Sequence, residues 1–350
     1  MTRPDLTVMG GGIFGLSIAW EATRRGARVR LIEAAQIGAG SSGGVVGALA
    51  PHVPENWNDK KAFQLDSLLM AQDFFASVTA ASGLPTGYAR LGRLQPLDSP
   101  EALVRAAERG AEAQGLWQGQ AQWQVVPASG AAWEPRSATG HLVYDTLSAR
   151  LHPRMACHAL VAALRARGGE VLVGQAETMP QTQCPVIWAT GHSGLLALNQ
   201  ALGRKVGAGV KGQALLIAYD ARDMPQMQVD GLHIVPHADG TVAIGSTSET
   251  QWEDPAGVDI QCEALLARAL AAVPALQGAV VLDRWAGIRP RARSRAPMLG
   301  AWPGRAGEYV ANGGFKIGFG MAAKVAQVMV DLVLDGVDRV PEGFRVEASL

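Results

Sequence analysis

Three glycines near the start of the chain have a spacing that suits phosphate binding. Gly10, Gly12 and Gly15 follow an apolar segment that begins at Thr7, and the helix-like run Leu16–Arg25 comes after them. Glycines at this spacing allow a tight turn, a close approach of backbone N–H groups to a pyrophosphate, and close packing of a helix on a strand. The amino end of the helix adds about half a positive charge where the phosphates would lie. We therefore expect a dinucleotide-binding turn here.

An acidic residue ends the next strand-like segment. Glu33 follows the strand-like segment at 27–32, in which apolar residues alternate with Arg28 and Arg30. A carboxylate at this offset can accept hydrogen bonds from both ribose hydroxyls of a dinucleotide and would repel a 2′-phosphate. Glycine triplets alone also occur in ordinary turns, but the strand, the helix and the acid together favour a nucleotide. The motif itself fits NAD as well as FAD.

A second stretch of small residues, 38–47, contains Ser41, Ser42, Gly43 and Gly44. A linker can have this composition, but this stretch leads directly into Ala48-Leu49-Ala50-Pro51 and a long apolar helix. Small residues also let the backbone pack against an extended ligand. We favour the ligand interpretation.

Composition narrows the class of protein. The chain has 350 residues, 48% hydrophobic and 18% charged, which is enough for about two domains with a well-buried core. Lys plus Arg and Asp plus Glu both number 31, so nothing favours a basic nucleic-acid surface. The sequence shows no leader-like segment and no run of about eighteen apolar residues, so we expect a cytoplasmic protein. It also shows no metal-ligand cluster, so we expect no metal. Three widely spaced cysteines, Cys157, Cys184 and Cys262, are typical of buried small residues.

The pattern of elements predicts an α/β fold with α+β, two-domain character. Helices are expected at 60–82, 100–114, 155–167, 259–272 and 321–334, and strands at 170–173 and 185–188. Antiparallel β structure is expected from 206 to 284, with a hairpin of 232–236 and 241–245 across Asp239-Gly240. We expect a Rossmann-like nucleotide-binding domain (1–83, 141–205 and 296–350) interleaved with an antiparallel β-sheet substrate domain (84–140 and 206–295).

Motifs along nearly the whole chain resemble the FAD-dependent D-amino-acid oxidase superfamily, especially its glycine and sarcosine oxidase branch. The resemblance is carried by the Gly10–Gly15 turn with Glu33, Ser41–Gly44, Ala189-Thr190-Gly191, Lys211-Gly212-Gln213, the hairpin with Gly245-Ser246-Thr247, Gly287-Ile288-Arg289-Pro290, and Gly313-Gly314-Phe315-Lys316. It implies that the nucleotide is FAD. Because no cysteine lies near 289–316, we expect the FAD to be held without a covalent link.

The resemblance also implies which residues hold the cofactor. They are Gly10, Gly12, Ile13, Phe14, Gly15, Glu33, Ala34, Ser41, Ser42, Gly43, Gly44, Ala189, Thr190, Gly191, Gly313, Gly314, Phe315, Lys316, Ile317 and Gly318. Reduced flavin carries negative charge near N1 and the C2 carbonyl, which the start of the helix near Gly318 would stabilise. A loop that only caps the helix is the alternative, but four glycines at 313, 314, 318 and 320 exceed what capping needs.

The resemblance implies that Arg289 grips the substrate carboxylate, for which a bidentate guanidinium is well suited. Lys316 matches a lysine of the sarcosine oxidase branch with a similar role. The alternative for Arg289 is membership of a solvated run of four arginines at 289, 291, 293 and 295.

Two positions depart from the family pattern. His233 stands where a tyrosine is common, and Ala243 stands where the sarcosine branch has an oxygen-activating lysine. His233 is still expected to face the substrate. His52 is expected near the isoalloxazine ring, although a histidine beside a proline is often structural.

The leading interpretation is oxidation of a small amine or amino acid, of the glycine, sarcosine or D-amino-acid type, to an imine by hydride transfer to flavin N5. The electron acceptor would be O2. A dehydrogenase of an amino or 2-hydroxy acid that passes electrons to a quinone or partner protein is the alternative. A flavin-bearing subunit without turnover is a minor one. No nucleic-acid partner or membrane span is expected, and an oligomer is possible.

Overall fold

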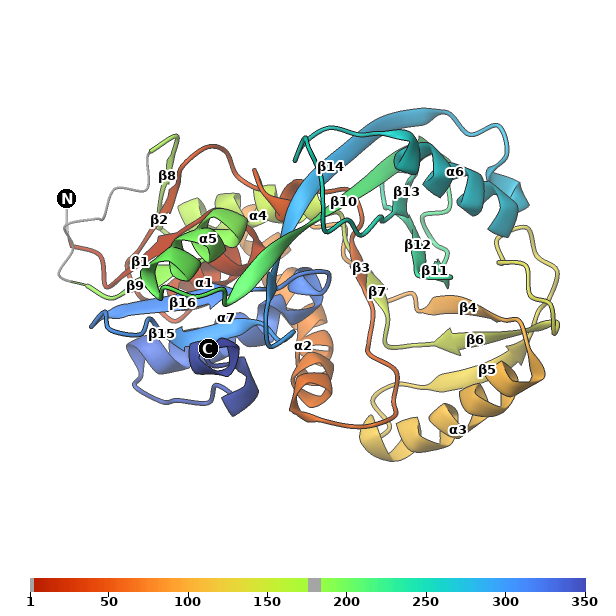
Figure 1. Cartoon of the computed structure of the whole chain (residues 1–350), viewed down its shortest axis with the longest axis horizontal. Helices are drawn as coiled ribbons and strands as arrows, with labels where there is room; N and C mark the ends of the chain where they lie inside the picture. The colour runs from red at the N-terminus through yellow and green to blue at the C-terminus, as the bar shows by residue number, and fades with distance from the viewer. Residues whose placement is uncertain (1–2, 176–183) are drawn as a thin grey trace.

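The computed structural model describes residues 3–175 and 184–350, and the fold has two large β-sheets side by side (Figure 1). The six strands of the first sheet are, in spatial order, β15 (Met298–Ala301), β16 (Glu308–Asn312), β9 (Val186–Trp188), β1 (Leu6–Met9), β2 (Val29–Glu33) and β8 (Glu170–Val173). All neighbours pair in parallel except β15 and β16. A parallel sheet of short apolar strands needs helices on both faces.

Helices cover both faces of this sheet. The helices on one side are α1 (Ile13–Arg24), α4 (Pro153–Ala166) and α7 (Gly318–Leu334), with α2 (Asp59–Ser82) packed on α4 and α7. On the other face lies α5 (Gly191–Ala201), whose Leu195 and Leu198 belong to the same hydrophobic cluster as Met9 and Trp188. Successive strand residues point to opposite faces, so Val8 and Met9 belong to different hydrophobic clusters.

The second sheet has eight strands. In spatial order they are β14 (Val281–Ala292), β10 (Gly207–Ala218), β13 (Thr241–Gly245), β12 (Leu232–Pro236), β11 (Gln226–Val229), β4 (Arg93–Leu97), β6 (His141–Asp145) and β5 (Trp123–Pro127). Neighbours are antiparallel except β11 and β4, which pair in parallel. The helices α3 (Pro100–Leu116) and α6 (Ile260–Ala272) pack on it.

Three features connect the two sheets. β3 (Ala48–Leu49) pairs with β7 (Ala149–Arg150), and the long strands β10 and β14 reach from the second sheet to α5 (Figure 1).

Short 3-10 turns lie at Ser41–Gly43, Pro274–Leu276, Glu342–Phe344 and Val346–Ser349. In the described part of the chain, no helix combines the length and apolar character needed to cross a membrane.

The α/β fold, the expected helices and the 232–245 hairpin agree with the sequence prediction, with differences at element ends, whereas α5 was not predicted. Helix α1 begins at Ile13 instead of Leu16, and β10 begins at Gly207 instead of Gln213 because it pairs with β14 along its whole length. Since β6 pairs with β4, we propose to assign residues 141–145 to the second domain and to keep the other expected boundaries. The expected ranges 1–83 and 141–205 include residues 1–2 and 176–183, which lie outside the described residues.

Candidate active site

The turn between β1 and α1 requires glycine for steric reasons. Gly10 has φ of +108°, and a Cβ atom there would lie 2.4 Å from the backbone oxygen of Ala189. A Cβ atom on Gly15 would lie 2.0 Å from the backbone oxygen of Gly10. The first glycine thus allows β1 to approach the loop after β9, and the last allows α1 to pack on the turn.

Side chains hold the glycine turn against its neighbours. The Glu33 carboxylate accepts the Gly11 N–H through Oε2 at 2.6 Å and the Ala35 N–H through Oε1 at 2.9 Å. The Ser42 hydroxyl accepts the Ile13 N–H at 3.0 Å, although it comes from the 3-10 turn Ser41–Gly43. This bond satisfies a backbone donor in the first turn of α1, where no residue of the helix can accept it.

A cavity of about 450 Å³ opens at the carboxyl ends of β1, β2, β9 and β16. Ligands bind at this edge in open α/β sheets. Among its lining residues are Gly10, Gly12, Ile13, Phe14, Glu33, Ala34, Ser41, Ser42, Ala189, Thr190, Gly191, Gly313, Gly314, Phe315 and Gly318. We call it the nucleotide cavity.

Five expected cofactor residues lie elsewhere. Gly15 and Gly43 do not line the nucleotide cavity, and a Cβ atom on Gly43 would meet the backbone oxygen of Gly38 at 2.4 Å. Close packing against neighbouring backbone oxygens explains why both positions are glycine. Gly44, Lys316 and Ile317 line a neighbouring cavity.

The residues of the nucleotide cavity fit a long, thin ligand that carries a pyrophosphate. The Ser42 hydroxyl takes the Ile13 N–H, but neither α1 nor α7 has a side-chain cap from the residue before it, so the remaining backbone donors at both helix starts are available to an anion. A Cβ atom on Gly314 would lie 2.8 Å from the Phe14 ring, which keeps this wall free of side chains. These donors and the Glu33 carboxylate suit the phosphates and ribose of FAD.

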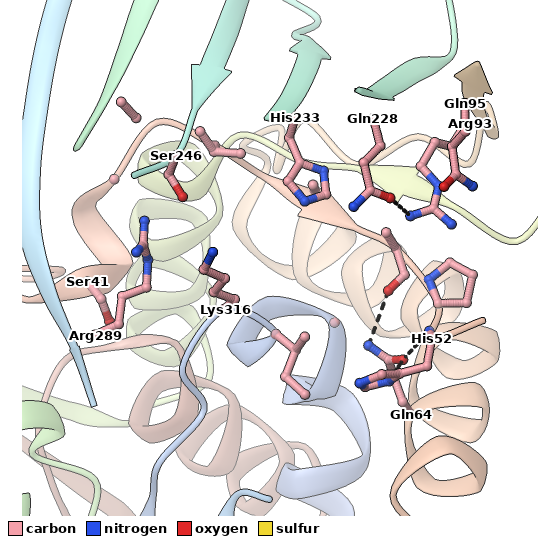
Figure 2. A pocket seen from close by; sticks show the side chains of 18 of the residues that line it. Ser41, His52, Gln64, Arg93, Gln95, Gln228, His233, Ser246, Arg289 and Lys316 are labelled. Atoms are coloured by element: carbon pink, nitrogen blue, oxygen red, sulfur yellow. Dashed lines mark hydrogen bonds between the residues drawn. The ribbon is translucent and has the colours of Figure 1, made fainter. Parts of the chain in front are cut away.

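A second cavity, of about 410 Å³, adjoins the first at Ser41 and lies against the second sheet (Figure 2). We call it the substrate cavity. The four expected catalytic residues, Arg289, Lys316, His233 and His52, all line it. They come from β14, the loop before α7, β12 and the loop after β3, so the fold gathers them from four distant segments.

Arg289 lies flat on the neighbouring strand. It is 7% exposed, and its Nη1 donates to the backbone oxygen of Thr247 at 3.2 Å. A Cβ atom on Gly212 would lie 1.9 to 2.1 Å from guanidinium atoms of Arg289, so only glycine leaves room for this arrangement. Burial lowers the pKa of Arg289 to about 10, an effect that Glu249 partly offsets. No carboxylate of the described residues forms an ion pair with Arg289.

The nearby carboxylate of Glu249 is committed to other groups. It accepts from Gln213 Nε2 at 3.1 Å and from the Thr247 hydroxyl, and it lies 3.7 Å from Lys211 Nζ. Its charge is therefore balanced by Lys211. Glu249 therefore stabilises the charge of Arg289 only from a distance, and Arg289 has no ion-pair partner of its own among the described residues.

Lys316 supplies a second cation. Its side chain projects into the substrate cavity near Arg289 (Figure 2), and within residues 3–175 and 184–350 it has no hydrogen-bond or ion-pair partner. Burial lowers the pKa of Lys316, and the positive charge of Arg289 lowers it further. Two cations without a carboxylate partner favour an anionic ligand between them.

His233 is a neutral ring in the wall. Burial, followed by the charges of Arg93, Lys316 and Arg289, lowers the pKa of His233 to about 3. Its Nδ1 is buried and has no hydrogen-bond partner among the described residues. His233 therefore contributes no positive charge at neutral pH.

His52 is fixed by a buried glutamine of α2. Gln64 Oε1 contacts both the His52 backbone N–H, at 2.8 Å, and the His52 Nδ1, while Gln64 Nε2 donates to the backbone oxygen of Ala50 at 3.2 Å. Burial and then Lys60 lower the pKa of His52. The ring is held in one orientation at the cavity edge.

Five polar lining residues escaped the sequence prediction: Gln64, Arg93, Gln95, Gln228 and Ser246. Arg93 donates to Asp145 Oδ2 at 2.8 Å and to Gln228 Oε1 at 2.7 Å, and Gln95 lies two residues along β4. Arg93 and Gln95 alternate along one short strand, and this pattern could have indicated that both side chains face the same side of the sheet. Since Asp145 balances its charge, Arg93 differs from Arg289 and Lys316.

Comparison with known proteins agrees with this geometry. The FAD dependent oxidoreductase family matches residues 5–332. Glycine oxidase of Pseudomonas putida is 27% identical over 97% of this chain and 98% of its own. The bifunctional protein ThiO/ThiG of Trichormus variabilis is 27% identical over 96% of this chain and 53% of its own. The solved structure of glycine oxidase from Geobacillus kaustophilus has a TM-score of 0.83 at 21% identity, covering 99% of each chain. The chain belongs to the FAD dependent oxidoreductase family, in its glycine oxidase-like branch, and is an FAD-dependent enzyme.

Proposed function

We propose that this enzyme oxidises a small amine or amino acid to an imine, and that Arg289 and Lys316 bind the substrate carboxylate. The observation that carries the proposal is the pair of cations without carboxylate partners in a cavity adjoining the nucleotide cavity. Bound FAD supplies the acceptor for the hydride that leaves the carbon next to the amine nitrogen.

The residues of the substrate cavity contribute mainly orientation. A carboxylate held by Arg289 and Lys316 is fixed at the side of the cavity nearest Ser41, where the two cavities meet. Hydride transfer from a neutral amine requires alignment more than a strong base. The neutral ring of His233 adds no further positive charge to a cavity that already contains Arg289 and Lys316.

The test compares Arg289→Ala and Arg289→Lys with Arg204→Ala, an exposed arginine outside the cavities. Flavin reduction is followed without oxygen with glycine, sarcosine and several D-amino acids. Loss of a buried cation that holds a carboxylate raises the half-saturating substrate concentration by about 100-fold or more. Arg289→Lys restores part of this loss. Undiminished reduction of the Arg289→Ala flavin by every active substrate rules out the carboxylate role.

The electron acceptor is a separate proposal. We propose O2, with a quinone or partner protein as the second candidate. Ala243 favours the second candidate, because it stands where the family resemblance implies an oxygen-activating lysine. It is fully buried, in one hydrophobic cluster with Val45, Ala214 and Val235. Rapid reoxidation of the reduced enzyme by air supports the oxidase, whereas slow reoxidation with rapid dye reduction supports a dehydrogenase. A flavin that no amine or 2-hydroxy acid reduces would indicate a subunit without turnover.

A further inference from the structure

A third cavity, of about 420 Å³, lies beside the substrate cavity. The two share His52, Lys316 and Ile317 as lining residues. Lys316 therefore faces both cavities, which lie side by side. The mechanism proposed above makes no use of this third space.

The third cavity is lined by cations and no carboxylates. Lys60, Arg291, Arg295 and Lys316 contribute positive charge, and His52 lies among them. None of the four has a salt bridge to any residue that the structure describes. The whole chain has equal numbers of acidic and basic residues, so this local excess does not follow from composition.

The cations also influence one another. Burial lowers the pKa of Lys60, and the charge of Arg295 lowers it further, which indicates that the two side chains are close. The Arg291 guanidinium carbon lies 5.6 Å from the centroid of the Phe315 ring. This contact restricts the orientation of the guanidinium group. Like charges held together in a partly enclosed space are stabilised by a bound anion.

We propose that the third cavity binds a second acidic group of the substrate, so that the preferred substrate class is an amine or amino acid with two anionic groups, carboxylate or phosphonate. This inference rests on the proposed function. Arg289 and Lys316 would hold one acid, and Lys60, Arg291 and Arg295 the other. Because Lys316 lines both cavities, we favour a second group carried by the substrate over a separate anion.

The first experiment compares matched substrates. Oxygen-free flavin reduction is measured with D-alanine against D-aspartate, and with sarcosine against N-(carboxymethyl)glycine, for wild type, Lys60→Gln and Arg295→Gln. We expect each variant to lower the ratio of diacid to monoacid kcat/KM about tenfold. The control is Lys205→Gln, an exposed lysine outside the cavity, which should keep the wild-type ratio. An unchanged ratio in both cavity variants overturns the proposal, while oxidation of the monoacids leaves the proposed function intact.

The second experiment needs no turnover. Calorimetric titration of the FAD-loaded protein with succinate and with inorganic phosphate measures anion binding even if no amine reduces the flavin. Succinate binding that Lys60→Gln and Arg295→Gln weaken and Lys205→Gln leaves unchanged supports the proposal. Phosphate binding that the cavity variants weaken, with no change in the substrate ratio, indicates a site for a free anion and overturns the assignment to the substrate. No binding of either anion also overturns it.

Discussion

The position of the Arg289 guanidinium depends on one missing methyl group. Gly212 leaves the space on β10 that this guanidinium occupies. In Gly212→Ala the clash falls on the end of a flexible side chain, so we expect the fold to survive while Arg289 moves. Misplacing a positioning group by about 1 Å can cost about 100-fold in rate. Substrate titration of flavin reduction should therefore show a large loss of kcat/KM.

The matched control for this substitution is Gly115→Ala. Gly115 lies in α3, where an added Cβ atom meets nothing within 4 Å. We expect this variant to keep wild-type kinetics. If Gly212→Ala also binds substrate normally, the guanidinium does not contact the substrate from its present position.

Two buried histidines make stability depend on pH. Burial lowers the pKa of His233 to about 3 and that of His237 to about 4, from an ordinary value of 6.5. Below pH 6.5 the unfolded chain takes up protons that the folded chain does not, so the free energy of unfolding falls as the pH falls. The loss reaches about 1.4 kcal/mol per pH unit for each group.

Replacement of one histidine tests this dependence. Urea unfolding at pH 7 and pH 5 should give a difference in unfolding free energy about 2 kcal/mol smaller in His233→Gln than in wild type. The exposed His158 provides the control, because His158→Gln should keep the wild-type difference. An equal difference in all three proteins would mean that His233 is protonated in the folded state at pH 5.

At the scale of elements, a buried ion pair joins β4 to β6. Arg93 is 3% exposed, and Asp145, its partner at 2.8 Å, is fully buried. Asp145→Asn leaves the Arg93 charge uncompensated at the cavity wall, which should lower the free energy of unfolding by about 3 kcal/mol. Asp283→Asn removes the partner of Arg154 in a half-exposed pair and should cost at most about 1 kcal/mol. Equal losses in the two variants would contradict the role of burial.

Local patterns predicted most elements and missed contacts that depend on long-range pairing. The hairpin at 232–245 follows from alternating apolar residues and an Asp-Gly turn. The start of β10, Gly207-Ala208-Gly209, has no strand-like residues and is extended because β14 pairs with it. Likewise, Gln228 reaches Arg93, 135 residues away, only because β4 and β11 lie side by side in parallel.

The candidate site shows the same division between local and distant signals. The glycine turn and Glu33 form one local unit, so a short segment of sequence was enough to predict the nucleotide cavity. The cationic third cavity was not predicted, because Lys60 and Arg295 are far apart in the sequence and no motif links them. Only the folded chain brings their charges together.

At the scale of the whole molecule, bound FAD should stabilise the fold. The nucleotide cavity is built from segments near both ends of the chain, including Gly10 and Gly318. A ligand that binds only the folded chain at 100 times its Kd adds about 2.7 kcal/mol. Thermal unfolding of the FAD-free protein should therefore shift upward as FAD is added. NAD at equal concentration should give a smaller shift, and an equal one would contradict the specificity for FAD.

The pairing of β10 with β14 has a consequence for how this protein can fail. Val210 stands opposite Arg289, and Gly212 lies two residues further along the same face. A slip of one residue between these strands would turn every side chain of the slipped strand to the opposite face. Because Ala286, Gly287, Ile288 and Pro290 of β14 also line the nucleotide cavity, a slip of β14 would disturb the flavin site together with the substrate site. Loss of bound flavin would therefore accompany loss of activity, and the flavin absorbance of the purified protein would detect the misfolded fraction.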